Sequence, residues 1–252
     1  MKLYIDKNRY IDTEKPLDIS LVLSNTLENP RAWYVDPPVI EAVNSNGFVG
    51  SVMDGGSVNF RNIFFNPHGH GTHTECLGHI TTEVFSVNNS LKSYFFIAEL
   101  ITLDPICVFN EKEKVNDKKI LKEQLIKKLK GKNIEAVVIR TSPNEEGKKH
   151  LNYTETNPAF LDIECIEILN DCGVQHLLID LPSVDRENDE GKLAFHHAFW
   201  QVPENPQFEK TITELIFVKN SIVDGEYILE LQTAPFENDA SPSRPVLYSI
   251  IS

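Results

Sequence analysis

The segment from residue 67 to residue 79 is the part of the chain best suited to chemistry, because it combines several imidazoles with a carboxylate. Four of the eight histidines fall here with one glutamate, namely His68, His70, His73, His79 and Glu75. Neutral imidazole and carboxylate groups are the usual protein ligands of zinc, manganese and iron(II). We therefore predict a divalent metal site in this segment.

Local geometry suggests which of these side chains converge. Three glycines and the lack of a helical period indicate a loop with a short extended exit. Alternate residues of an extended chain share a face, so His73 and Glu75 should point the same way. The preceding turn would supply a third ligand, either His68 or His70. His79 could be a further ligand or a proton carrier.

The same segment also has a plainer interpretation. Glycine-rich histidine loops occur as solvated turns, and a lone histidine is most often structural. The chain has no HExxH on a helix and no CxxC pair, so the best-known zinc motifs are absent. Four histidines and a glutamate in one turn nevertheless favour a metal site over a solvated turn.

The elements that must position this loop follow an α/β pattern. Short apolar, β-prone runs alternate with two amphipathic segments, the first capped by Asp117 and the second opened by Pro158 and ended by Gly173. This order predicts parallel strands joined by helices, packed against a larger mixed sheet in one α/β domain spanning 1–252. The strands are expected at 93–103, 135–141 and 174–180, and the helices at 117–130 and 158–172.

The flanking segments are predicted to be mostly β-structure. A hairpin is expected from 3–5 and 9–11, a long loop over 24–46, and further strands at 17–23, 47–53, 58–65 and 224–231. Asp180 and Asp185 follow the strand at 174–180, where helix capping and turn hydrogen bonds are their expected roles.

Composition narrows the classes of partner. The chain has 252 residues, 41% of them hydrophobic, which is ordinary for a globular protein. The formal net charge of −13 disfavours nucleic acid and anionic membrane surfaces as partners. No apolar run reaches the ~20 residues that span a bilayer. The four scattered cysteines and the lack of a signal-like start suit a cytoplasmic protein with reduced thiols.

The histidine loop also carries a resemblance. Gly71-Thr72-His73-Thr74-Glu75-Cys76-Leu77-Gly78-His79 resembles the HxGTHxDxPxH signature of the metal-dependent cyclase-type hydrolases, which include kynurenine formamidases and isatin hydrolases. Glu75 stands where the family has aspartate. The first family histidine falls on Gly69 without a gap, and on His68 or His70 with a one-residue shift. The resemblance implies a swivelling β/β/α-like fold.

Further residues enter through this resemblance. His196 and Glu214 look like the family's second histidine and glutamate positions, so with His79 they could complete a second metal position bridged by Glu75. Alternatively, one ion is bound, and His79 and Glu214 act as acid and base. His196 is preferred to His197 because it suits the family position better. Only one of the two can be a ligand, because adjacent residues on an extended chain face opposite ways. The family is typically oligomeric, and Trp33 and Trp200 offer aromatic surface for a homodimer or larger assembly.

The resemblance implies hydrolysis of a C–N bond in a small amide, formamide or cyclic amide by water activated on Zn²⁺ or Mn²⁺, as one or two ions. No phosphate-binding loop, dinucleotide fingerprint or GxSxG elbow is present to suggest another chemistry. The alternative is a non-catalytic member of the same fold that binds a small ligand, with Glu75, Gly69 and Gly78 marking a degraded site.

Overall fold

A mixed β-sheet forms the centre of the structure, a computed structural model that describes residues 1–252. Its hydrogen-bonded order is β1-β2-β18-β16-β9-β12-β14-β15-β8-β17, with β3 paired to β18. Strands β9, β12, β14 and β15 are parallel, and the other neighbours are antiparallel. The strands are Lys2–Tyr4 (β1), Tyr10–Asp12 (β2), Leu17–Asp18 (β3), His73–Glu75 (β8), Phe95–Leu103 (β9), Ala136–Thr141 (β12), His176–Ile179 (β14), Thr211–Glu214 (β15), Gly225–Glu230 (β16), Ala240–Pro242 (β17) and Val246–Ile251 (β18).

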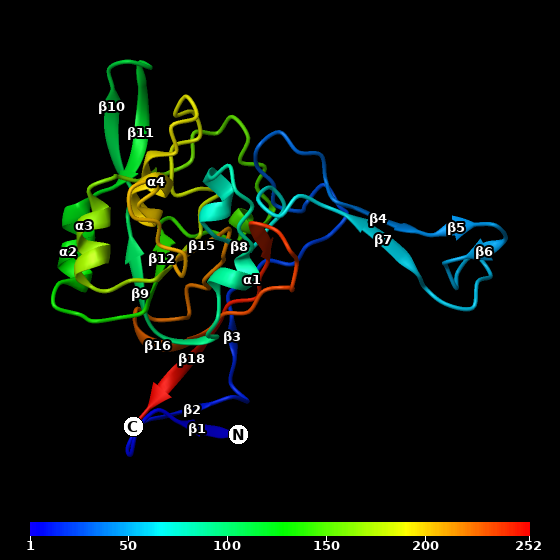
Figure 1. Ribbon diagram of the computed structural model, residues 1–252, viewed down its shortest axis with the longest axis horizontal. Coiled ribbons are helices and arrows are strands. Elements are labelled where there is room, and N and C mark those ends of the chain that lie inside the picture. The colour runs from blue at the N-terminus through cyan, green and yellow to red at the C-terminus, as the bar shows by residue number, and fades with distance from the viewer.

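Strands β9, β12 and β14 are mainly apolar on both faces because each face is covered, whereas β15 has the sequence Thr-Ile-Thr-Glu. Adjacent residues of β9, Leu100 and Ile101, belong to two different hydrophobic clusters. Helices α2 (Lys122–Leu129), α3 (Cys165–Asp171) and α4 (Ala194–Trp200) contribute side chains to the cluster that contains Ile101. Figure 1 shows α2 and α3 side by side. The predicted α/β class, with its mixed sheet and parallel βαβ units, is therefore confirmed.

Two predicted helices begin later than expected. Residues Val115–Ile120 form strand β11, which pairs with β10 (Ile106–Asn110), so Asp117 is a buried strand residue and caps no helix. Its carboxylate accepts hydrogen bonds from Asn110, Asn157 and Arg186 instead. Long-range pairing has overridden the local helical pattern, and only α2 keeps it.

The second helix is shortened in the same way. Pro158 opens no helix, because Phe160–Leu161 form strand β13, which pairs parallel with β11. Helix α3 starts only at Cys165, and Gly173 at φ +79° ends it as predicted. Trp200 in α4 is fully buried, so the expectation that it offers surface for a subunit contact is wrong.

A narrow two-stranded arm projects from the body of the molecule (Figure 1). Strand β4 (Val39–Ala42) pairs with β7 (Arg61–Phe64), and β5 (Asn44–Ser45) pairs with β6 (Phe48–Val49) at its far end. The predicted loop over 24–46 therefore contains two short strands. The strands expected at 47–53 and 58–65 are shorter than predicted, and only Leu17–Asp18 of 17–23 is a strand.

Three short helices complete the chain, namely η1 (Leu77–Ile80), α1 (Val87–Ser90) and η2 (Glu146–His150). None of the helices has both the length and the apolar character needed to cross a membrane.

Candidate metal centre

Two neighbouring strands place three of the predicted ligands side by side. Strand β8 pairs antiparallel with β15, and the pairing sets Glu214 opposite His73. His73 Nε2 lies 3.6 Å from Glu214 Oε2 and 4.0 Å from Glu75 Oε2, and all three residues are buried. His73 and Glu75 therefore lie on the same face of an extended segment. Between them, Thr74 turns to the other face and shares a hydroxyl hydrogen bond with Thr213.

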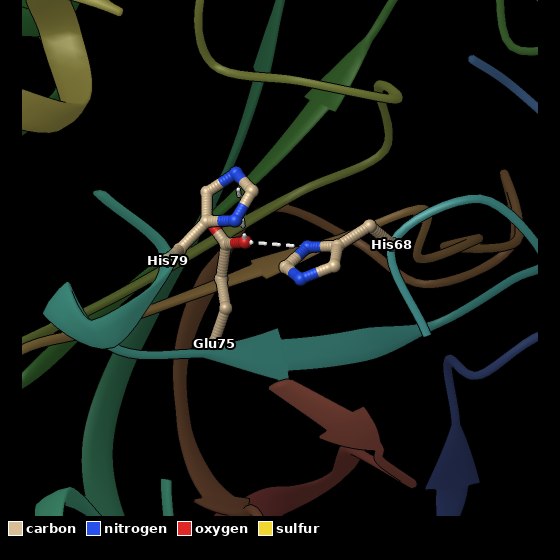
Figure 2. Close-up of side chains that lie close together, drawn as sticks. All are labelled: His68, Glu75 and His79. Carbon is tan, nitrogen blue, oxygen red and sulfur yellow. Dashed lines mark ion pairs between the residues drawn. The ribbon is translucent and has the colours of Figure 1, made fainter. Parts of the chain in front are cut away.

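The segments on either side of β8 bring two more imidazoles to Glu75. His68 Nδ1 lies 3.0 Å and His79 Nε2 lies 3.9 Å from Glu75 Oε2. The two rings stack with their centroids 4.1 Å apart. Figure 2 shows both rings converging on the Glu75 carboxylate, His68 from the loop before β8 and His79 from η1 after it.

Helix α4 supplies a fourth imidazole from the opposite direction. His196 Nε2 lies 3.0 Å from Glu75 Oε1, whereas His197 contacts the Val202 carbonyl and does not reach Glu75. The expectation that only one of the two could be a ligand rested on an extended chain, and that premise is wrong because both residues are helical. Successive residues of a helix also point in different directions, which separates the two rings here.

His70 takes no part in this cluster. Its Nδ1 accepts a hydrogen bond from the backbone N–H of Asn66, and its Nε2 donates one to the Asp36 carbonyl. Both ring nitrogens are bonded to the backbone, so His70 holds the loop in place. Its inclusion among the possible metal ligands is therefore wrong.

The imidazoles are oriented by hydrogen bonds on the side away from Glu75. His73 Nδ1 donates to the Gly71 carbonyl, His196 Nδ1 to Asp185, and His68 Nε2 to Asp239, at 2.9, 2.6 and 2.8 Å. Each bond leaves the other ring nitrogen facing the cluster. Metal-binding histidines characteristically show this arrangement, because the outer partner fixes the tautomer and the ring orientation.

Two buried polar atoms of the cluster lack any hydrogen-bond partner, His73 Nε2 and Glu75 Oε2. The close approach of His68 Nδ1 to Glu75 Oε2 lacks hydrogen-bond geometry, as expected if both atoms face a common third partner. Burial and the repulsion of Glu75 raise the pKa of Glu214 well above its usual range. These two atoms and the paired carboxylates fit a divalent cation. Such an ion would bind the two unpartnered atoms and would offset the repulsion between Glu75 and Glu214.

The donor atoms form two groups that share Glu75. One group contains His68, Glu75 and His79, and the other contains His73, Glu75 and Glu214. His68, His73 and His79 all face the same oxygen of Glu75, Oε2, so these residues could hold one ion, or two that share Glu75. His196 lies against the other Glu75 oxygen and 3.9 Å from Glu214 Oε1, at the edge of the second group.

Comparison with known families identifies the chain. Residues 17–186 match a family model described as "Putative cyclase", which covers more than half of the protein. The chain belongs to this Cyclase family. Of the candidate ligands, His196 and Glu214 lie beyond the matched segment. A search of curated proteins finds no match.

Solved structures share the fold. An isatin hydrolase A from Labrenzia aggregata has a TM-score of 0.65 at 12% identity, with 93% of each chain covered. An isatin hydrolase A from Ralstonia solanacearum has a TM-score of 0.64 at 14% identity, and the match covers 94% of this chain and 92% of that one. A predicted metal-dependent hydrolase from Bacillus stearothermophilus has a TM-score of 0.62 at 17% identity, and the match covers 93% of this chain and 98% of that one.

The structure gives a steric reason for glycine at Gly69, where the signature quoted above has histidine, and at Gly78, which that signature leaves unspecified. A Cβ at Gly69 would lie 2.8 Å from Val35 Cγ2 and 3.2 Å from the Ala32 carbonyl oxygen. No histidine fits there, and the adjacent His68 faces Glu75 instead. A Cβ at Gly78 would lie 2.3 Å from the Phe85 carbonyl oxygen, so η1 needs glycine to turn His79 inward.

Sequence reasoning missed one functional candidate and saw another only in part. Asp239 holds His68 and lies 3.6 Å from His79 Nδ1, but it is an isolated aspartate in the loop before β17, and no spacing pointed to it. Asp185 caps α4 through the backbone N–H groups of Phe195 and His196, as predicted, and it also orients the His196 ring.

Proposed function

We propose that this Cyclase-family protein is a hydrolase that uses Zn²⁺ or Mn²⁺, as one or two ions, to cleave the C–N bond of a small amide, formamide or cyclic amide. The observation that carries the proposal is the shared Glu75 cluster, with orphaned atoms on His73 and Glu75. A cavity of about 380 Å³, whose lining includes His68, His79 and Glu214, opens beside it and can admit a small substrate.

Each residue of the cluster has a definable task in this proposal. When bound, a divalent cation supplies Lewis acidity, which polarises a carbonyl group and makes water a stronger acid. His73, Glu75 and Glu214 form the buried part of the binding site, and His68 and His196 complete it from either side. His79 is partly exposed at the cavity wall, so it can move a proton between the site and the leaving nitrogen.

The similar structures support the reaction class. Two of them are isatin hydrolases, and another is described as a potential metal-dependent hydrolase with cyclase activity. The alternative of a degraded, ligand-binding site is disfavoured, because His68 replaces the missing imidazole and Glu75 lies within 4.0 Å of four imidazoles, those of His68, His73, His79 and His196.

The test is turnover by protein loaded with zinc or manganese. We expect slow hydrolysis of N-formylkynurenine, isatin or related aryl amides and lactams, abolished by chelator and restored by the ion. Stoichiometric metal without turnover of any compound in a broad amide panel would overturn the hydrolase and favour the ligand-binding alternative.

Replacement of His79 by glutamine distinguishes its two possible roles. If His79 moves protons, kcat should fall about 10²-fold with metal content unchanged, and the pH–rate profile should lose one ionisation. If His79 is a ligand, bound metal should fall together with kcat. Metal analysis and pH–rate profiles of both proteins make the comparison, and an unchanged kcat would contradict both roles.

We also propose that residues 1–252 form one cytoplasmic domain that assembles into a homo-oligomer. The two main hydrophobic clusters lie on opposite faces of the same sheet, which supports one domain. The projecting arm exposes apolar side chains that a second subunit could cover, among them Met53, Phe60, Ile63 and Phe64. Light scattering should give a mass above 28.6 kDa at micromolar concentration, and a monomer mass would contradict the assembly.

A further inference from the structure

We propose that the groove outside the metal centre selects amides whose amine half carries a positive charge. The inference rests on the hydrolase function proposed above and adds the class of substrate. It starts from the continuity of two cavities, of about 380 and about 570 Å³, which share Trp33, Arg186, Glu187 and Asn188 as lining residues. Together they form one groove that leads outward from the His68, His79 and Glu214 side chains.

The outer groove is negatively charged. Glu187 accepts hydrogen bonds only from the backbone N–H groups of Glu155 and Asn157, and Asp189 only from those of Gly191 and Leu193. Backbone donors fix these carboxylates in place but do not neutralise them. Neither carboxylate forms an ion pair with a lysine or arginine.

The other charged residues of the groove do not reverse this sign. Arg186, the one lysine or arginine in the lining, is paired with Asp117 at 2.9 Å. Glu190 pairs with both Lys112 and Lys192, which leaves one positive charge there, fewer than the unpaired carboxylates of the groove. Glu113 and Glu155 add further carboxylates at the outer end. Tyr34 lies at the same outer end, and the pKa of its hydroxyl is raised by partial desolvation and by Glu155 and Glu187.

Trp33 forms an aromatic wall along the groove. It lines both cavities, and its backbone has φ +62°, next to the hydrogen bond from Ala32 N–H to the Gly69 carbonyl. A left-handed backbone is unfavourable for tryptophan, and the surrounding loop must impose it. The indole face attracts cations as well as apolar rings, so it reinforces the preference set by the carboxylates.

The charge distribution orients the substrate. A carbonyl group would face the metal centre, and the nitrogen side would extend along the acidic groove. Hydrolysis breaks the C–N bond, with water giving its hydroxyl to the acyl carbon and its proton to nitrogen. The acid product then loses a proton, and the anion it forms is repelled by the groove through which it must leave.

A matched set of formanilides tests the inference on metal-loaded protein. The compounds share the formamide and the ring, and carry para aminomethyl, methyl or carboxylate groups. We expect kcat/KM to be about tenfold or more higher for the ammonium compound than for the carboxylate at low salt. The ratio should shrink in about 1 M salt, where the Debye screening length is only about 3 Å.

Two variants locate the effect. Glu187→Gln and Asp189→Asn remove the charge and keep an oxygen for one of the two backbone N–H groups, because each carboxylate uses both of its oxygens. Each should lower the ratio several-fold. Glu41→Gln, at an exposed glutamate of the arm, is the matched control and should leave the ratio unchanged. Equal rates for the three compounds, or preference for the carboxylate, would overturn the inference while leaving the hydrolase proposal intact.

Binding separates failure of the inference from failure of the proposed function. Quenching of Trp33 fluorescence is measured with benzyltrimethylammonium and with benzenesulfonate, and Trp33→Phe identifies the signal because the other tryptophan, Trp200, is fully buried. Tighter binding of the cation without hydrolysis of any formanilide would support the groove and overturn the hydrolase. Tighter binding of the sulfonate, or no binding of either probe, would overturn the groove.

Discussion

Glu75→Gln is expected to remove bound metal and to lower kcat/KM about a thousandfold, equivalent to ~4 kcal/mol of transition-state stabilisation. Both candidate ligand groups depend on this residue, because Glu75 is their only common member. Glutamine has nearly the same volume, but it lacks the negative charge and turns an amide N–H₂ toward surrounding imidazoles. Metal analysis after purification without chelator, with steady-state kinetics on the active amide, measures both effects.

The matched control is Glu99→Gln on β9. Glu99 is also a buried glutamate, but it pairs with Lys132 and lies outside both ligand groups. This variant should keep its metal and its activity. His73→Ala should behave like Glu75→Gln, since it removes the orphaned Nε2. A full metal equivalent in either site variant would show that the ion is held elsewhere.

The part of the site predictable from sequence is the part encoded within one stretch of chain. The two-residue repeat of an extended strand was enough to place His73 and Glu75 on one face. The apolar runs that became β12 and β14 were equally clear, because strands covered on both faces need such residues throughout. His196 and Glu214 were found through family resemblance, since their distance along the chain carries no geometric information.

The remaining features depend on contacts that no local pattern records. Asp239 reaches His68 across 171 positions of sequence, and only the pairing of β17 with β8 brings it there. The segment at Asp117 has a helical pattern, yet its hydrogen bonds go to β10 and to Arg186. His70 was the alternative to His68, the preferred third ligand, and only the backbone path shows that both nitrogens of His70 are occupied.

Metal binding is expected to stabilise the fold strongly. At a free ion concentration about 1,000 times Kd, mass action contributes ~4 kcal/mol. For a chain of this length that corresponds to a rise in Tm of roughly 8–16 °C. Thermal unfolding with chelator and with buffered free Mn²⁺ measures the difference, and equal melting temperatures would show that the folded protein does not bind the ion.

This stabilisation should increase with pH. In the metal-free cluster, burial alone lowers the pKa of His68 and His196, but the neighbouring carboxylates raise both to about 10, namely Asp239 and Glu75 for His68, and Asp185 and Glu75 for His196. Both rings therefore stay protonated in the folded state above their unfolded pKa of about 6.5. Their contribution to stability is fully present below that pH and is lost as pH rises toward 10.

A bound cation needs neutral imidazoles and therefore replaces these protons. The Tm of the metal-free protein should fall between about pH 6.5 and about pH 8.5, whereas that of the metal-loaded protein should not. The gap in Tm between the two forms should therefore widen with pH. His196→Gln should reduce the pH dependence of the metal-free protein, whereas His150→Gln, at an exposed histidine outside the cluster, should not. A gap that stays constant or narrows with pH would mean that metal and protons do not compete for these rings.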